Sequence, residues 1–458
     1  MIFKGLSLSF RRGEKTLLLG PSGCGKSTLL QVLSGIVPHT VELPMKADDL
    51  VAPEKFGYVF QDPDAQFCMP YVDEELAFVL ENLQVTRERM PELIRRYIEL
   101  VGLQLKDIHT PIRQLSQGMK QRLAVACILA LEPDVIFLDE PTALLDPEGT
   151  EQVWETIRNI AEDKTLIVVE HKIDGIIGFV DRVVVFTPDG DVLADGQPDE
   201  VFRRYRKELT EYGIWHPGVW DDAGPPLRTK PAPSERTAPE PDADRPVLSL
   251  RDFRGFRGGR PAVAVSRADV QAGDWIAVVG PNGAGKSSLL LAIMRLIRSE
   301  GSCLLQGTVC RKPEQAALEA AFVFQNPELQ FVTDSVEAEL AFSLDPSDPA
   351  VIESALAAYG LLPLRERHPY QLSMGQKRRL SVASALIRGQ RLLLLDEPTF
   401  GLDARSTFRL LVQLERLRAE GTAILMVTHD PHIVRRCCNR IWRVSEGKLT
   451  ESEAIVWS

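Results

Sequence analysis

The chain has 458 residues, 26% of them charged, which is enough for two or three globular domains and is not the composition of a disordered chain. The formal net charge is −11, with 64 acidic against 53 basic residues, and this disfavours a nucleic-acid surface, which needs clustered Lys and Arg. Seven scattered Cys residues without a CxxC pair predict neither a disulfide framework nor a zinc site, and neither a transmembrane run nor a signal peptide is predicted.

The first predicted strand, at residues 16–19, leads into the glycine-rich stretch GPSGCGKST at 20–28 and then into a helix. Backbone N–H groups of such a loop surround phosphate oxygens, and the N-terminus of the helix adds a favourable dipole. We expect Lys26 to reach the β- and γ-phosphates of a nucleotide and Ser27 to bind Mg²⁺. The predicted nucleotide-binding residues of this loop are Gly20, Ser22, Gly23, Gly25, Lys26, Ser27 and Thr28.

Two later strands of the first half end in residues suited to hydrolysis of a phosphoanhydride. VIFLDE (135–140) ends in Asp139, expected to hold Mg²⁺ through water, and Glu140, expected to orient and polarise the attacking water. TLIVVEH (165–171) ends in His171, which we expect to hydrogen-bond the γ-phosphate and the acidic base. A strand-end Asp-Glu alone would be a helix cap and a lone His a structural residue, so these assignments depend on the phosphate loop upstream.

The end of the first half predicts a closing helix over 199–214, followed by a segment rich in Pro, Ala and charge. Such a segment buries too little apolar surface to fold and is typical of a semi-extended linker. We therefore expect domains at 1–214 and 247–458, joined by a Pro-rich linker at 215–246.

The second half repeats the motifs of the first in the same order, about 260 residues later. The matching stretches are GPNGAGKSS (280–288), VFQNPELQF (323–331), QLSMGQ (371–376), LLLLDE (392–397) and MVTH (426–429). A period this long indicates two homologous domains rather than a solenoid. The corresponding predicted site residues are Gly280, Asn282, Gly283, Gly285, Lys286, Ser287, Ser288, Asp396, Glu397 and His429.

The alternation of short apolar runs with helical stretches predicts an α/β fold in each half, with a mainly parallel sheet covered by helices. A second Ser-Gly turn opens a helix in each half, with Ser116 and Gly118 in one and Ser373 and Gly375 in the other. A phosphate-loop protein with this extra turn resembles the ATP-binding cassette (ABC) family, in which each domain is an α/β core with a helical subdomain.

The resemblance implies that the Ser-Gly turn of each domain completes the site of the other, in a head-to-tail pair bridged by two Mg-ATP molecules. One composite site would join Lys26, Asp139, Glu140 and His171 to Ser373 and Gly375. The other would join Lys286, Asp396, Glu397 and His429 to Ser116 and Gly118. A flexible linker would make this pairing intramolecular, at an effective concentration on the order of millimolar.

The stretch VFQDPDAQF (59–67) also occurs twice. Gln61 and Gln325 resemble the family's Q-loop glutamine, which contacts Mg²⁺ and the nucleotide. With a second Gln in each copy, Gln66 and Gln330, the stretch resembles that of the ATPases of energy-coupling factor (ECF) and cobalt/nickel importers. The fusion of two such domains in one chain resembles the two-domain ATPases assigned to thiamine or hydroxymethylpyrimidine uptake. The resemblance implies ATP hydrolysis at the cytoplasmic face of a bacterial or archaeal membrane, with a transmembrane coupling protein and a membrane substrate-binding protein as partners.

Two departures and two alternatives accompany this interpretation. Phe256 stands where the family has an adenine-stacking aromatic residue, usually Tyr, whereas the first half has no counterpart, as expected if the start of the chain is truncated or misassigned. Gln117, Met119 and Met374 replace the usual residues of the Ser-Gly turns. A soluble two-domain ATPase acting on ribosomes or DNA stays open, although the short Pro-rich linker and the net negative charge disfavour it. A fused sugar-import ATPase also stays open, although it should lack the doubled glutamine pattern.

Overall fold

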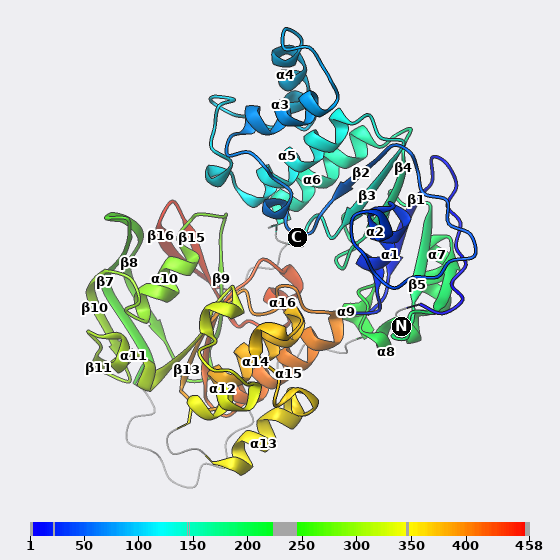
Figure 1. The fold of residues 1–458 in the computed structure, drawn as a ribbon. Coiled ribbons are helices and arrows are strands. Elements are labelled where there is room, and N and C mark those ends of the chain that lie inside the picture. The colour runs from blue at the N-terminus through cyan, green and yellow to red at the C-terminus, as the bar shows by residue number, and fades with distance from the viewer. Residues whose placement is uncertain are drawn as a thin grey trace. The chain divides into compact units, whose positions relative to one another are not determined.

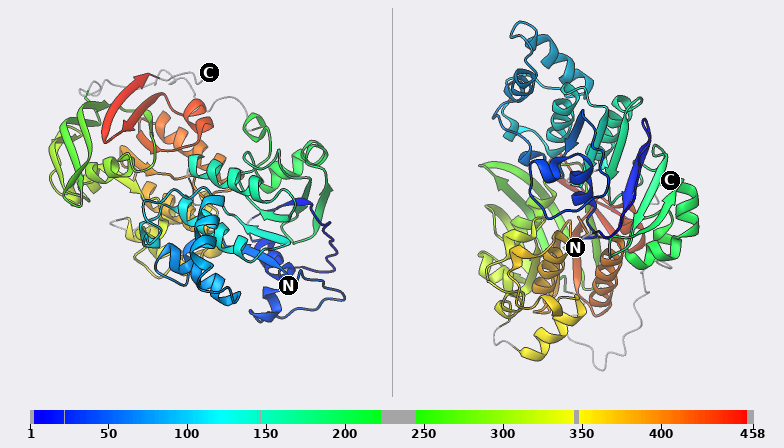
Figure 2. Two further views of the ribbon diagram at one scale, coloured as in Figure 1. Left: turned by 90° about the horizontal axis from the view of Figure 1, so that it is seen from above. Right: turned by 45° about the vertical axis from the view of Figure 1, so that its right-hand side comes forward.

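The computed structural model describes residues 3–21, 23–143, 145, 147–222, 245–344 and 348–453. The chain divides into two compact units, the first built mainly from residues up to 219 and the second mainly from residue 220 onward. Each is described by itself (Figures 1 and 2). Most of the predicted linker, residues 223–244, and Ser22 of the first phosphate loop lie outside the described residues.

The first unit contains a six-stranded sheet of order β2-β3-β4-β1-β5-β6, parallel except for its last pair. Its strands are β1 (Lys15–Leu19), β2 (Phe56–Val59), β3 (Val135–Asp139), β4 (Thr165–Val169), β5 (Arg182–Phe186) and β6 (Val192–Gly196). The central strands are buried apolar runs, as expected for a parallel sheet covered on both faces. This confirms the predicted α/β fold.

The helices of the first unit form two groups (Figure 1). In one group, the signature helix α5, which begins at the Ser-Gly turn, packs on β2 and on α6. It also contacts α3 and α4, which lie on the side of α5 away from the sheet. The helix predicted over 199–214 is in fact two short helices, because Tyr205 between them has non-helical backbone angles. The helices are α1 (Lys26–Leu33), α2 (Ile36–His39), α3 (Val72–Asn82), α4 (Met90–Leu100), α5 (Gln117–Ala130), α6 (Pro147–Ile160), α7 (Pro198–Arg204), α8 (Arg206–Tyr212) and α9 (Val219–Asp222), the last at the boundary between the units.

The second unit contains a ten-stranded sheet of order β11-β10-β7-β8-β16-β15-β9-β14-β13-β12. The run from β15 to β12 is parallel and matches the core of the first unit, whereas β7, β8, β10 and β11 add an antiparallel part. The strands are β7 (Leu248–Arg257), β8 (Arg260–Val270), β9 (Trp275–Val279), β10 (Ser299–Leu305), β11 (Thr308–Val309), β12 (Ala320–Val323), β13 (Leu392–Asp396), β14 (Ala423–Val427), β15 (Arg440–Ser445) and β16 (Lys448–Glu453).

The helices of the second unit repeat the arrangement of the first, with the signature helix α14 packed on β12 and on α12. They are α10 (Lys286–Ile293), α11 (Pro313–Glu319), α12 (Val336–Phe342), α13 (Pro349–Ala358), α14 (Met374–Leu386), α15 (Ala404–Ala419) and α16 (Pro431–Arg436). Short 3-10 turns, η1 (Pro63–Ala65) and η3 (Pro327–Gln330), follow β2 and β12. Among the described residues, no helix is both long and apolar enough to cross a membrane.

Candidate nucleotide-hydrolysis sites

Strand order brings the predicted site residues of each unit to one edge of its sheet. In the first unit β3, β4 and β1 are neighbours, and in the second β13, β14 and β9 are neighbours. The carboxyl ends of parallel strands share an edge, which is where open α/β sheets bind ligands. The phosphate loop, the acid pair and the histidine of each unit therefore converge, although they lie up to about 150 residues apart in sequence.

The phosphate loops join β1 to α1 and β9 to α10. Gly285 has a φ of 109°, and a Cβ there would lie 2.3 Å from the carbonyl oxygen of Ala262, so only glycine fits. Lys26 Nζ donates to the carbonyls of Gly20 (2.7 Å) and Pro21 (3.1 Å). Lys286 makes the same two contacts at 2.8 and 3.0 Å, so both ammonium groups are buried against their own loops. The remaining predicted residues, Gly23, Gly25, Thr28, Asn282, Gly283 and Ser288, lie in these loops or in the first helical turn.

The residues predicted to hold magnesium pair with one another. Ser27 Oγ donates to Asp139 Oδ1 at 2.8 Å, and Ser287 Oγ donates to Asp396 Oδ1 at 3.1 Å. Burial raises the pKa of both aspartates. Hydroxyl and carboxylate oxygens are the ligands that Mg²⁺ prefers, and a cation would offset the cost of burying these carboxylates, so the residues fit the ion.

Tyr58 distinguishes the first site and was not predicted. Its hydroxyl donates to Asp139 Oδ2 at 3.1 Å, and burial together with the Asp139 charge raises the pKa of Tyr58. Phe322 occupies the equivalent place before the repeated stretch and offers no hydroxyl. Comparison of GYVFQ with AFVFQ, the two segments that lead into Gln61 and Gln325, could have revealed the difference.

The two candidate general bases have the same unusual backbone. Glu140 and Glu397 have φ values of 48° and 51°, in the left-handed region that costs a non-glycine residue on the order of 1 kcal/mol. The adjacent strand holds each one, because the N–H of Glu140 donates to Val169 O at 2.8 Å and that of Glu397 to Val427 O at 3.1 Å. Strained backbone at matching positions of both units supports a functional role.

Each general-base candidate contacts the predicted histidine. His171 Nε2 lies 2.9 Å from Glu140 Oε1, and His429 Nε2 lies 3.2 Å from Glu397 Oε1. Burial alone would raise the pKa of Glu140, but the hydrogen bond and charge of His171 lower it. Gln61 Nε2 donates to Glu140 Oε2 at 2.9 Å, so the Q-loop glutamine of the first unit also reaches this carboxylate.

The Ser-Gly turns begin the signature helices. Ser116 Oγ accepts the N–H of Met119 (3.3 Å) at the start of α5, and Ser373 Oγ accepts the N–H of Gln376 (3.4 Å) at the start of α14. Gln376 completes a capping box by accepting the N–H of Ser373. Gly118 and Gly375 lie in the first turn of these helices. That each Ser-Gly turn completes the nucleotide site of the opposing unit remains a prediction.

The repeated VFQxPxxQF stretch ties the Q-loop to the signature helix. Asp62 and Asn326 cap η1 and η3 by accepting N–H groups two residues on, at 3.0 Å in both units. The acid two residues before the second Gln then forms an ion pair with the signature helix, Asp64 with Lys120 at 2.6 Å and Glu328 with Lys377 at 2.5 Å. The stretch therefore has a structural function that is the same in both units.

In the second unit this connection is reinforced. Gln330 Nε2 donates to Ser381 O (2.9 Å) and Ser384 Oγ (2.8 Å), and Ser381 Oγ donates back at 2.7 Å. Arg378, only 1% exposed, donates to the carbonyls of Phe324 (2.6 Å) and Gln325 (2.5 Å). Burial lowers the pKa of Arg378 to about 10.

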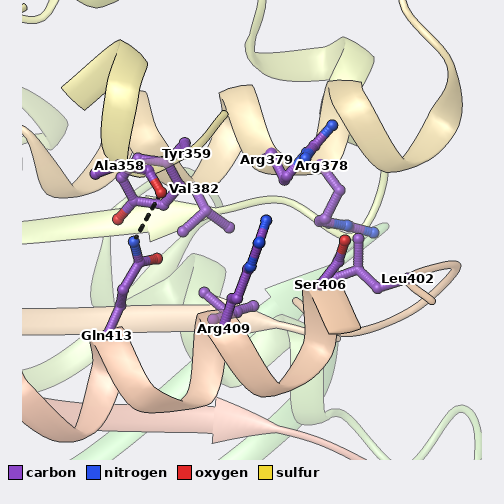
Figure 3. Close-up of a pocket in the computed structure, with 10 residues that line it drawn as sticks. Ala358, Tyr359, Arg378, Arg379, Val382, Leu402, Ser406, Arg409 and Gln413 are labelled. Carbon is purple, nitrogen blue, oxygen red and sulfur yellow. Dashed lines mark hydrogen bonds between the residues drawn. The ribbon is translucent and has the colours of Figure 1, made fainter. Parts of the chain in front are cut away.

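In the first unit the corresponding contacts are longer and fewer. Gln121, the counterpart of Arg378, donates to Phe60 O at 3.4 Å, and the N–H of Phe60 donates to Gln66 Oε1 at 3.4 Å. Figure 3 shows that the side chain of Arg378 extends from α14 and lines one side of a pocket, and that residues of α15 line the opposite side.

Buried carboxylates anchor the segment that follows each Q-loop, and the sequence did not reveal them. Glu75 accepts the N–H groups of Cys68 (2.8 Å) and Met69 (2.7 Å). Glu339 accepts those of Val332 (3.1 Å) and Thr333 (3.0 Å). The signal was present, because a Glu recurs at the fourth position of each following helix. The predicted adenine-stacking residue Phe256 lies at the end of β7, with the guanidinium of Arg298 over its ring.

A family profile described as "ABC transporter" matches residues 3–143 and 265–400, which together are more than half of the chain. The chain belongs to the ABC transporter ATPase family. It contains two cassettes in tandem, and membership implies ATP binding and ATPase activity.

Similar proteins refine this placement. The chain is 38% identical over 94% of its length, and 85% of the relative's, to a Bacillus subtilis (strain 168) protein provisionally named as an HMP/thiamine import ATP-binding protein, YkoD. It is 32% identical over 97% of its length, and 85% of the relative's, to a Methanosarcina mazei protein provisionally named as an ABC transporter ATP-binding protein. Among solved structures, the RNase-L inhibitor is similar with a TM-score of 0.65 at 19% identity, over 97% of this chain and 87% of the other, which shows a shared fold alone.

Proposed function

We propose that this ABC ATPase is the energy-coupling subunit of an ECF-type importer, with a vitamin or metal ion as cargo and a thiamine precursor as the specific candidate. Two observations support the proposal: the B. subtilis relative is named for HMP/thiamine import, and the Q-loop stretch is built onto the signature helix in both cassettes. The cassettes would be 1–214 and 247–458 with a linker at 215–246, and the chain would work at the cytoplasmic face of the membrane.

In the proposed cycle each composite site binds Mg-ATP. In the first site Lys26 would contact the phosphates, and Ser27 and Asp139 would hold the ion. In the second site Lys286 would contact the phosphates, and Ser287 and Asp396 would hold the ion. The ion, when bound, supplies charge neutralisation at the phosphates. Glu140 and Glu397 orient the attacking water and accept its proton, while His171 and His429 fix those carboxylates. The Ser-Gly turn of the opposite cassette completes each site, so hydrolysis requires the two cassettes to close on each other.

The observation that carries the coupling role lies beside the Q-loop of the second cassette. Leu329 in η3 is 69% exposed, Val332 next to Glu339 is 65% exposed, and Phe342 at the end of α12 is 71% exposed. These three exposed apolar side chains follow the Q-loop within the next 17 residues, so this segment is our candidate for the interaction surface. Helices of a membrane coupling protein would bury these side chains, and the ion pair of Lys377 with Glu328 would transmit their movement to α14.

Affinity purification from detergent-solubilised membranes of the host, followed by mass spectrometry, tests the proposal. We expect a small polytopic coupling protein and a second membrane protein to accompany the chain, and the second protein would identify the cargo. Leu329→Arg should abolish their recovery, whereas Leu318→Arg, at an equally exposed leucine (67%) on α11, should not. Recovery of ribosomal or DNA-bound proteins without integral membrane proteins would refute the importer.

A further inference from the structure

A buried carboxylate links two loops of the first hydrolysis site. Glu170 directly precedes His171 at the end of β4 and is 2% exposed. Its Oε1 accepts hydrogen bonds from the N–H of Thr142 (3.2 Å) and from the Thr142 hydroxyl, and its Oε2 accepts from the N–H of His171 (2.8 Å). Thr142 comes two residues after Glu140, so one side chain joins the loop after β3 to the loop after β4.

The second cassette lacks this link. Thr428 occupies the equivalent position, is 1% exposed, and uses its hydroxyl to accept the N–H of Asp430 (3.1 Å) at the start of α16. Thr399 is the counterpart of Thr142, and within the described residues no hydrogen bond joins it to Thr428. In both cassettes the histidine still lies within hydrogen-bonding distance of its glutamate, with His171 Nε2 2.9 Å from Glu140 Oε1 and His429 Nε2 3.2 Å from Glu397 Oε1.

A carboxylate is an expensive group to keep in this position. Burial raises the pKa of Glu170 to about 7, and the nearby Glu140 charge acts in the same direction. The hydrogen bonds from Thr142 and His171, and the charge of His171, oppose the shift. A threonine fills the same place in the second cassette, so the fold itself does not require an acid there.

We propose that Glu170 is a positioning residue of the first site, which holds the backbones of Thr142 and His171 together and thereby keeps the His171 imidazole against Glu140. The inference rests on the catalytic roles proposed for Glu140 and His171. Thr428 has too short a side chain to span the same gap. The Glu170 link between the two loops is thus a feature of the first site, and Thr428 supplies no such link in the second.

The test compares Glu170→Thr, Glu170→Gln and the control Glu155→Thr, at an exposed position of α6, in the full-length chain. We expect Glu170→Thr to lower kcat for ATP at least twofold with KM changed less than twofold, since Lys26 and its loop still bind the phosphates. Glu170→Gln should have an intermediate kcat, because its single oxygen can accept hydrogen bonds from Thr142 or from His171 but not from both. Amide hydrogen exchange at His171 should accelerate about tenfold in Glu170→Thr, while the His429 segment serves as an unchanged internal reference.

The alternatives give different results. If Glu170 only fills space, the nearly isosteric Glu170→Gln will match the wild type in kcat, which overturns the proposal even if Glu170→Thr unfolds. Glu140→Gln separates the two levels of the argument. If it abolishes turnover while both Glu170 variants hydrolyse ATP normally, the positioning role is wrong and the proposed site stands. If Glu140→Gln retains full turnover, the proposed site fails, and the positioning role fails with it.

Discussion

Replacing Arg378 by Gln, the residue at the matching position of the first cassette, should loosen the Q-loop of the second cassette. Arg378 donates two short hydrogen bonds to the carbonyls of Phe324 and Gln325 from a position that is 1% exposed. A hydrogen bond from a charged donor contributes about 1.5–3 kcal/mol, and a buried acceptor left unpaired costs about 1–3 kcal/mol. Gln can satisfy one carbonyl, and removal of a buried charge offsets part of the loss.

The net destabilisation of the second cassette should therefore be about 1–3 kcal/mol. Urea unfolding of the full-length chain would measure it, and hydrogen exchange over residues 324–330 would locate it. The control is Arg388→Gln, at an exposed arginine that follows α14, which should change stability by less than about 0.5 kcal/mol. If Arg378→Gln unfolds with the wild type and the exchange of 324–330 is unchanged, the two hydrogen bonds do not anchor the Q-loop and the reasoning is wrong.

Three further predictions concern the candidate general bases, the buried Glu170 and the Gln330 network. Glu140→Gln and Glu397→Gln should each remove more than half of the steady-state ATPase activity if the composite sites are coupled; retention of half or more in each would show independent sites. The raised pKa of Glu170 makes the folded state bind this proton more tightly than the unfolded state does. The contribution of Glu170 to stability should therefore fall as pH rises from about 4.5 through about 7, by on the order of 3 kcal/mol, and Glu170→Thr should remove that part of the slope from unfolding measured across this range. Gln330→Leu should leave the Ser381 hydroxyl without its acceptor, while Ser384 Oγ keeps its bond to Ser381 O, and should destabilise the second cassette by about 1–3 kcal/mol; unfolding no different from wild type would show that water replaces the amide.

Local sequence patterns were sufficient for the parts of the site that depend on a few consecutive residues. The loops around Lys26 and Lys286 and the strand ends at Asp139 and Asp396 were predictable because a glycine-rich turn or a buried apolar run encodes them directly. The repeat then supported each weak signal with a second copy, which is how His171 and His429 could be proposed from a residue type that is usually structural.

Contacts between distant segments could not be predicted in the same way. The ion pair of Asp64 with Lys120 joins residues 56 apart, and no periodicity indicates which exposed acid meets which lysine. Glu170 appeared as one polar residue at the end of an apolar strand, and only the fold shows that it reaches Thr142. The antiparallel strands β7, β8, β10 and β11 likewise depend on long-range pairing, and they distinguish two units whose motifs are almost the same.

If the two cassettes pair head-to-tail, as proposed, the differences between them would all affect the same composite site. The first cassette strengthens its own hydrolysis residues, through Tyr58 on Asp139 and Glu170 behind His171. The second cassette instead strengthens its signature helix, through Arg378 and Gln330. In a head-to-tail pair that helix presents Ser373 to the Lys26 site, so both sets of contacts would stiffen the same composite site. The site at Lys286 would lack both, and we expect it to be the one whose geometry depends more strongly on bound nucleotide.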